Sequence, residues 1–295
     1  MQSADFLSAV FFYLKVGENL NQNWIVENLN NAFSTWNGKL GELWGLVTTS
    51  PQTFKGGAVW SVMQTLHNGM VGIGYALVVL FFAISLCKNT MNFHELKRPE
   101  AAIHYFLRFV AAKALVGYGM DIMLNVFSIC NGIVTDMADS TGGISEAMVS
   151  LPAEMQTAIE NVGFLASIPL WLVTILGSLF ITVLSFVMIL TVYGRFFRLY
   201  MYTALAPLPL AAFAGESTQS VGISFLKSYV GVCLEGAVIV LACVIYSAFV
   251  STPTVTSGEA TTIVWSFLAE TVFNMLVLVG LIKGSDRIIH EMMGL

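Results

Sequence analysis

The chain has 295 residues, of which 56% are hydrophobic and only 11% carry charge, and its formal net charge is −5. Because soluble domains carry about 25% charged residues, this composition excludes a chain surrounded entirely by water and indicates that lipid covers much of its surface. The negative charge and the lack of a basic stripe also exclude the usual footprint of a nucleic-acid-binding domain. We therefore predict an all-α, polytopic membrane protein.

The first segment of the chain, residues 1–59, mixes polar and apolar residues and is rich in asparagine. A stripe of apolar residues at helical spacing packs against protein or lies on a membrane surface, and the sequence leaves both interpretations open. We predict an extracytoplasmic or interfacial amphipathic helical segment at 1–59, which Ser50-Pro51 ends, ahead of a transmembrane domain at 60–295. The apolar stripe consists of Trp24, Ile25, Leu29, Phe33, Trp36, Leu40, Leu43, Trp44 and Val47.

Apolar stretches long enough to cross a bilayer, which takes about 20 helical residues, follow one another in the transmembrane domain. The third stretch is the longest and contains no charged residue, so we expect it to be tilted or to extend beyond the lipid. We predict about five transmembrane helices, at about 66–87, 109–134, 162–193, 225–250 and 263–282.

The segment 196–214 is apolar enough to span, but Pro207 and Pro209 interrupt it. Each proline lacks a backbone donor and disfavours helix in the residue before it. We therefore predict that this segment does not cross and instead forms a Pro-broken re-entrant or interfacial hairpin at about 199–215. Irregular backbone at membrane depth is tolerated only against protein or a water-filled cavity, so the hairpin should pack in an assembly or near a passage.

The charges of the loops indicate the orientation. Lys88, Lys97, Arg98 and Arg108 follow the first predicted span, Arg195 and Arg198 the third, and Lys283 and Arg287 the last. The loop at 135–161 contains acidic residues and no Lys or Arg. Since cytoplasmic loops collect Lys and Arg, we expect a multi-pass protein of the cytoplasmic membrane with its N-terminus outside, its C-terminus in the cytoplasm, and the acidic loop 135–161 outside.

Polar side chains inside the predicted spans are Lys113, Asp121, Glu235, Glu270 and Asn274. A charge at the centre of a spanning helix costs at least about 2.5 kcal/mol, so such residues face protein or water. Lys113 and Asp121 are two helical turns apart, and Glu270 and Asn274 one turn, so each pair should share a face. We favour contacts between helices or subunits; the lining of a wet passage and a proton relay are the alternatives.

Small residues indicate close helix packing. Gly280 and Gly284 form a G-x-x-x-G spacing at the end of the last predicted span, a pattern that lets helix backbones approach closely.

Motifs of enzymes are missing from the sequence, which has no HExxH, no P-loop and no G-x-S-x-G. The four cysteines and four histidines lack metal-ligand spacing. We expect no catalytic residues, no cofactor and no metal site. No internal repeat is visible either, which weakens a secondary-transporter interpretation, since many transporter folds are built from repeats.

The arrangement resembles a known family at this point. Arg195-Phe196-Phe197-Arg198-Leu199 leads into the apolar stretch Ala204–Ala211 with its two prolines, and Gly215-Glu216-Ser217 follows. Together with Leu43-Trp44-Gly45-Leu46-Val47 and Ser50-Pro51 ahead of the first span, this order is similar to that of TrbL-type polytopic inner-membrane subunits of type IV secretion and conjugation machines. The compact length and short tail are similar to versions from Gram-positive conjugative elements.

The resemblance implies a non-enzymatic channel or scaffold subunit that helps a DNA–protein substrate cross the cytoplasmic membrane, driven by partner ATPases. Its implied partners are the lipid bilayer and other type IV secretion subunits; further copies of the chain, and transient contact with single-stranded DNA and a relaxase, are compatible with it. The alternative is a stand-alone small-solute or ion transporter or channel that uses intramembrane carboxylates.

The resemblance also directs attention to particular residues. We expect a docking surface or gate at the predicted hairpin, and an outward assembly surface at the acidic loop 135–161. The hairpin residues concerned are Arg195, Arg198, Pro207, Pro209 and Glu216.

Overall fold

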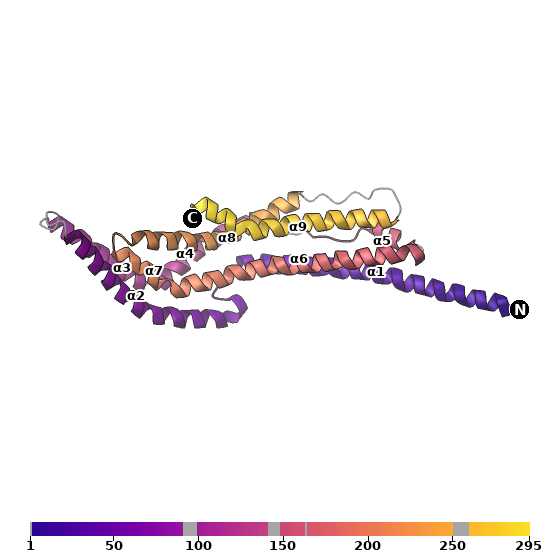
Figure 1. Ribbon diagram of the computed structural model, residues 1–295, viewed down its shortest axis with the longest axis horizontal. Coiled ribbons are helices and arrows are strands. Elements are labelled where there is room, and N and C mark those ends of the chain that lie inside the picture. Colours follow the sequence, from indigo (N-terminus) through magenta and orange to yellow (C-terminus); the bar gives the residue numbers. More distant parts are fainter. Residues whose placement is uncertain (1, 91–98, 141–147, 163, 250–259) are drawn as a thin grey trace. The chain divides into compact units, whose positions relative to one another are not determined.

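The computed structural model describes residues 2–90, 99–140, 148–162, 164–249 and 260–295. Every regular element within these ranges is a helix (Figure 1). The helices are α1 Gln2–Thr48, η1 Phe54–Gly57, α2 Ala58–Thr90, α3 Pro99–Gly117, α4 Gly119–Ser140, α5 Ala153–Glu160, α6 Phe164–Leu205, α7 Pro207–Ala211, η3 Ala212–Ala214, α8 Gln219–Phe249 and α9 Ala260–Met293.

The chain forms two compact units. Unit 1 comprises Met1–Trp44, Gly142–Thr191 and Ala242–Lys283. Unit 2 comprises Gly45–Thr141, Val192–Leu241 and Gly284–Leu295.

Helices long and apolar enough to cross a membrane confirm the prediction of an all-α polytopic membrane protein. In the described residues they are Phe54–Lys88, Ile168–Leu205, Gln219–Phe249 and Thr262–Met293. A fifth candidate is the bent pair Ile103–Gly117 and Gly119–Ser140, whose axes differ by 71°.

The bend between α3 and α4 corrects the prediction of one continuous helix at 109–134. Glycines flank Tyr118 at the break, and both approach their neighbours closely: a Cβ on Gly117 would lie 2.8 Å from the Tyr75 hydroxyl, and one on Gly119 3.1 Å from Leu210 Cδ1. Because the axis turns here, Lys113 and Asp121 do not share a face of one straight helix. The sequence offered only local periodicity, which does not reveal a bend set by packing.

The predicted external loop is also more helical than expected. Helix α4 continues to Ser140, so residues 135–140 belong to it, and α5 occupies Ala153–Glu160. Residues 141–147 lie outside the described part of the chain. No Pro or Gly interrupts 135–140, which explains why the helix continues past the apolar stretch.

The predicted hairpin starts later than expected. Residues 199–205 continue α6, and the break comes at Ala206, directly before Pro207 at the start of α7. A proline restricts the residue before it but fits the first turn of a helix, so the preceding turns of α6 stay helical. Residues 206–218 then fold back as two short helices, and they do not form a further spanning helix.

The hairpin, which we define as residues 206–218, lies in the core of unit 2. Its small side chains share one buried cluster with residues of α2, α3, α4, α6 and α8, so the irregular backbone is covered by protein, as the bilayer requires. The buried residues are Ala206, Leu210, Ala211 and Ala214 of the hairpin, Val78 of α2, Ala112 and Val116 of α3, Met123, Phe127 and Cys130 of α4, and Leu199, Tyr229, Val232 and Cys233 of α6 and α8.

The connection from α1 to α2 is fixed by aromatic packing in unit 2. Phe54 stacks on Phe196 with ring centroids 4.1 Å apart, and the Tyr200 hydroxyl donates a hydrogen bond to the Pro51 carbonyl at 2.8 Å. Gly56 and Gly57 have φ of 73° and 77°, a left-handed conformation that glycine adopts without steric cost. The Ser50-Pro51 break therefore becomes an anchored turn.

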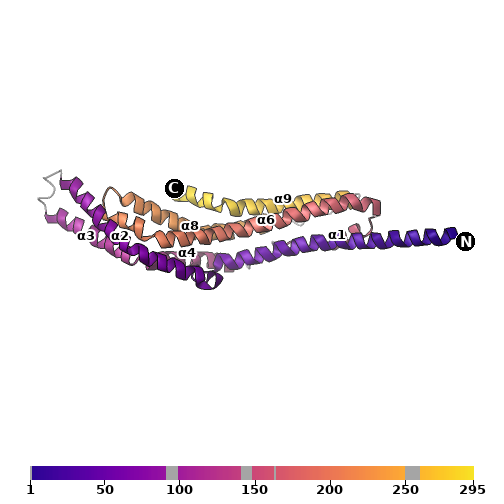
Figure 2. The same cartoon turned by 60° about the horizontal axis from the view of Figure 1, so that its bottom comes forward.

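In unit 1 the apolar stripe of α1 packs against protein. Six of its residues are at most 2% exposed, and Phe33 meets the Phe267 ring of α9 edge-on at 6.3 Å. Trp24 is 40% exposed and lies at the edge of the stripe, against Trp171 of α6. Figures 1 and 2 show α1 alongside α6. Within unit 1, the buried residues of the stripe are Ile25, Leu29, Phe33, Trp36, Leu40 and Leu43.

Gly74 gives a test of the hairpin packing. A Cβ at this position would lie 2.9 Å from the Pro207 carbonyl oxygen and 2.9 Å from Val116 Cγ1, whereas Gly72 on the same helix has nothing within 4 Å. We expect Gly74→Ala to destabilise the protein by about 1–3 kcal/mol through overpacking. Gly72→Ala should be neutral or slightly stabilising because alanine favours helix. Thermal unfolding in detergent measures both, and equal midpoints for the two variants would contradict the packing.

Candidate functional site

Two arginines on α6 organise the polar interior of unit 2. Arg195 and Arg198 are three residues apart, so they project from the same side of the helix. The Arg195 side chain is fully buried, and Arg198 is 29% exposed. Both follow a long charge-free stretch of α6, where an unpaired charge would be costly.

Arg195 binds main-chain carbonyl groups. Its Nε donates to the Val232 carbonyl at 3.3 Å, its Nη2 to the Cys233 carbonyl at 3.1 Å, and its Nη1 to the Val47 carbonyl at 3.3 Å. The guanidinium has five N–H donors and no acceptor, which suits it to this role. It thereby joins α6 to α8 and to the last turn of α1.

Gly236 makes room for the Arg195 guanidinium. A Cβ at Gly236 would lie 2.7 Å from Arg195 Nη1 and 2.8 Å from its Cζ. No residue with a side chain fits at this position while Arg195 keeps its hydrogen bonds.

Arg198 lies between two carboxylates. Its Nη2 donates to both carboxylate oxygens of Glu235 on α8, at 2.7 and 2.6 Å, and its Nη1 pairs with Oδ1 of Asp286 on α9. The Ser285 hydroxyl donates a further hydrogen bond to Glu235 Oε1 at 3.2 Å. Three helices therefore meet at one guanidinium. We call Arg198, Glu235, Ser285 and Asp286 the charge network.

Burial differs along the charge network. Glu235 is 1% exposed, whereas the side chain of Asp286 is 43% exposed and lies 3.6 Å from Nε2 of His290. Removing one partner of a buried pair costs about 3–5 kcal/mol because the other charge is left uncompensated. The Arg198–Glu235 pair should therefore matter for stability, whereas the pair with the half-exposed Asp286 should contribute little.

The other intramembrane residues singled out from the sequence are not part of the charge network. Lys113 and Asp121 are exposed, as is Glu270, and Asn274 is buried at 8% exposure. Glu270 and Asn274 therefore do not present one common polar face, although they are one turn apart on α9. Burial of the helix flank decides this, and the sequence spacing does not report it.

The hairpin residues have different surroundings. Pro207 is buried and Pro209 is partly buried. Glu216 is 64% exposed and lies 4.0 Å from Nη1 of Arg108 on α3, whose Nη2 donates to Gln219 at 3.2 Å. Arg195 is fully buried, so its side chain presents no surface to a docking partner.

The two glycines predicted to allow close helix packing have open space around them in the described part of the chain. Gly280 and Gly284 have nothing within 4 Å of an added Cβ. Close approaches occur instead at Gly177, next to Leu268, and at Gly231, next to Ile289. A G-x-x-x-G spacing gives the potential for close packing, and the rotation of the helix decides whether a neighbour uses it.

Sequence reasoning missed Ser285, Asp286 and Gly236. Asp286 lies beyond the last predicted span, which ends at residue 282. A signal was present: Arg198 follows a long apolar stretch and needs anionic partners on other helices, and Asp286 lies just beyond the last predicted span. In the described part of the chain, no group of three or more His, Cys, Asp or Glu side chains is arranged to hold a metal ion.

A double-mutant cycle tests whether Glu235 and Asp286 contribute unequally to stability through their pairs with Arg198. We expect Arg198 and Glu235 to show a coupling energy of about 2 kcal/mol or more, and Arg198 and Asp286 at most about 1 kcal/mol because solvent screens the exposed partner. Glu235→Gln, Asp286→Asn and Arg198→Gln, alone and in pairs, supply the cycles, with unfolding followed in detergent. Equal couplings would contradict the assignment of Glu235 as the main partner.

Gly236→Ala tests whether the Arg195 guanidinium needs the space that Gly236 leaves open. The added methyl group collides with the guanidinium, so we expect a loss of about 2 kcal/mol or more as charged hydrogen bonds break. Gly194→Ala on α6, where an added Cβ meets nothing within 4 Å, is the matched control and should not destabilise. A Gly236→Ala protein that unfolds at the control's temperature would show that Arg195 has another stable arrangement.

Comparison with known protein families identifies one that matches the chain. A family model described as "TrbL/VirB6 plasmid conjugal transfer like protein" matches residues 36–207. This stretch includes the end of α1, α2–α5, all of α6 and Pro207. No curated protein and no solved structure gives a significant match to the chain.

Proposed function

The chain belongs to the TrbL/VirB6 conjugal transfer family, and from this premise we propose that it is a non-enzymatic scaffold and channel subunit of a conjugative, type IV secretion machine. In this role it helps a DNA–protein substrate cross the cytoplasmic membrane. Partner ATPases supply the energy, and contact with the relaxase and single-stranded DNA is transient. The membership itself makes the chain a component of a conjugal transfer system with several membrane-spanning helices.

The charge network is the observation that carries the scaffold proposal. Glu235, which a proton relay would need to exchange with water, is 1% exposed and bound by Arg198 and Ser285. A carboxylate held in this way fixes the positions of α6, α8 and α9 relative to one another within unit 2. This favours a structural role for the charge network over a stand-alone ion transporter driven by Glu235.

Two surfaces are proposed for assembly. At the hairpin, the exposed Glu216 beside Arg108 offers paired charges to a cytoplasmic partner, with Pro207 and Pro209 holding the turn behind it. On the predicted outer side, α5 exposes Glu154 and Glu160. The basic residues after the first, third and last spans support an N-terminus outside and a C-terminus in the cytoplasm.

Apolar replacement distinguishes a scaffold from a relay. Glu235→Met leaves Arg198 without its buried partner, so we expect conjugal transfer to fall roughly tenfold or more, since each 1.4 kcal/mol is a factor of ten. Arg198→Met combined with Glu235→Met removes both charges and should restore most of the transfer, because apolar replacement of a buried pair is often neutral. Mating frequency is measured in a strain that lacks the chromosomal or plasmid copy.

A relay differs in the double variant, which would be as inactive as the single variant while both remain stably inserted. Immunoblots of membranes control for the amount of each variant. The stand-alone transporter is tested separately: the purified chain in liposomes should give no solute uptake or ion conductance, and it should co-purify with other membrane subunits of the transfer system. Transport by the chain alone would overturn the scaffold proposal.

A further inference from the structure

Helices α1 and α6 run side by side in the same direction in unit 1. Trp24 meets Trp171 with ring centroids 5.7 Å apart, the Asn28 amide donates to the Ser178 hydroxyl at 2.9 Å, and the Lys39 ammonium lies 5.9 Å from the Phe186 ring centroid. From the first to the last contact both helices advance by the same number of residues. At 1.5 Å per residue, they are at matching levels over about 22 Å.

The outward face of α6 at these levels is apolar. Large aliphatic and aromatic side chains cover it, and the helix passes every criterion of length and composition for a membrane span. Such a face suits hydrocarbon. The exposed residues are Leu172, Leu176, Leu179, Phe180, Val183, Phe186 and Leu190.

The outward face of α1 at the same levels is polar. Beyond Trp24, every exposed residue up to Trp44 is polar or glycine. We call this set the polar face of α1; it consists of Glu27, Asn30, Asn31, Ser34, Gly38 and Gly41. Neighbouring helices of one unit therefore present surfaces of opposite character at one depth.

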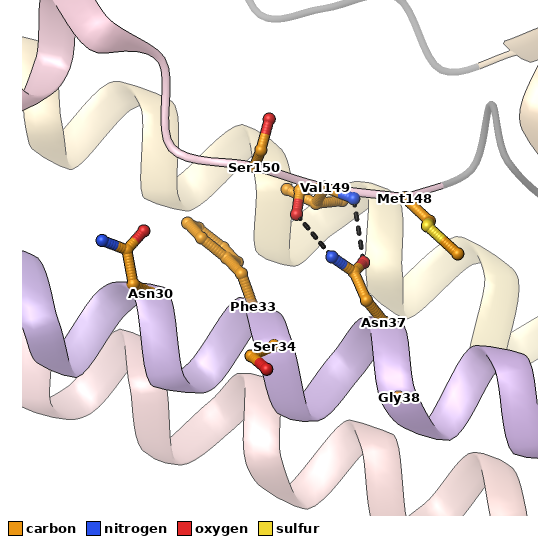
Figure 3. A pocket seen from close by; sticks show the side chains of 8 residues that line it. All are labelled: Asn30, Phe33, Ser34, Asn37, Gly38, Met148, Val149 and Ser150. Carbon is orange, nitrogen blue, oxygen red and sulfur yellow. Dashed lines mark hydrogen bonds between the residues drawn. The ribbon is translucent and has the colours of Figure 1, made fainter.

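Two open grooves flank the polar face. One, of about 490 Å³, is lined by Asn30, Ser34 and Asn37 of α1 and by residues 148–150 (Figure 3). Asn37 holds that segment: its amide donates to the Val149 carbonyl at 2.8 Å and its carbonyl oxygen accepts from the Val149 N–H at 2.9 Å.

The other groove, of about 340 Å³, lies between α1 and α6. Asn28, Asn31 and Thr35 line it from α1, and Ser178 and Thr182 line it from α6 beside Ile175 and Leu179. The hydroxyl groups of this apolar part of α6 thus point towards α1 and away from the face that suits lipid. Both helices contribute polar groups to one surface.

Hydrocarbon cannot cover this surface. A buried amide or hydroxyl without a hydrogen-bond partner costs roughly 2–7 kcal/mol, and the polar face of α1 presents several. Water satisfies them all. We propose that the polar face of α1 lines a water-filled passage in the assembled transfer machine, along which the polar substrate moves; this inference rests on the proposed function.

The chemistry of the face suits a moving polyanion. Amide and hydroxyl groups and glycines offer weak, replaceable contacts, and the one charged member, Glu27, is acidic. A surface of Lys and Arg would bind phosphodiesters tightly, whereas conduction requires contacts weak enough to release. The occupant is therefore water together with a hydrated, negatively charged chain passing through.

Cysteine accessibility tests the proposal in cells that contain the complete transfer machine. Cys87 is exposed and is replaced by serine; the other cysteines are buried. Asn31→Cys, Ser34→Cys and Gly38→Cys report on α1, and Leu176→Cys, Phe180→Cys and Val183→Cys are matched controls on α6. A charged, membrane-impermeant thiol reagent is applied to opened membranes, because it reacts with the thiolate, which forms in water.

We expect the α1 positions to react about tenfold faster or more than the α6 positions, and a bulky reagent at the α1 positions to lower mating frequency while the same reagent at the α6 positions does not. Reaction at both sets would overturn the proposal by placing this part of unit 1 outside the membrane. Protection of both sets would overturn it by showing that protein or lipid covers α1. Reaction at α1 without any effect on mating would show that the substrate passes elsewhere.

Deleting the chain separates a failure of this inference from a failure of the proposed function. If the chain had no part in transfer, deleting it would leave mating frequency unchanged, whatever the labelling result. If the chain serves transfer but α1 does not line the passage, deletion abolishes mating while the three α1 variants mate normally and their thiols stay unreactive or harmless when labelled.

Discussion

The ion pair in which Nη2 of Arg198 donates to both carboxylate oxygens of Glu235 is the interaction on which unit 2 depends. Both groups are held among apolar helices, where neither charge would be tolerated alone. Each therefore fixes the other, and because Arg198 also pairs with Asp286, the rotation of α6, α8 and α9 about their axes is constrained at one point. Arg195 extends the constraint by binding main-chain carbonyls, which it does without needing a second carboxylate.

The hairpin shows how small residues and prolines cooperate in the same unit. Pro207 ends α6 and begins α7, and alanines at 206, 211 and 214 let the short helices approach α2, α3 and α4. Gly74 completes the fit because it has no side chain at the place where the Pro207 carbonyl approaches. The irregular backbone is thereby enclosed by protein, which is the condition under which such backbone persists in a membrane.

Unit 1 illustrates a different principle, namely that the outer faces of neighbouring helices report on what surrounds them. Exposed leucines and phenylalanines on α6 suit lipid, whereas the exposed asparagines and serine of α1 do not. The contrast arises between helices in direct contact, so a difference in depth does not explain it. The proposed function would use both kinds of surface, the apolar one in the bilayer and the polar one towards a substrate.

The sequence by itself determined the membrane class, most of the spans, the apolar stripe of α1 and the break at the prolines, because composition, period and proline chemistry are local properties of the chain, whereas only the structure showed that the stripe packs against protein. Only the tertiary structure decided which polar residues meet. It paired Glu235 with Arg198, brought Asp286 from beyond the last predicted span to Arg198, left Gly280 and Gly284 without close neighbours in the described part of the chain, and bent the second predicted span at Tyr118. These outcomes depend on the rotation and contacts of helices far apart in sequence, which no spacing along a single chain encodes.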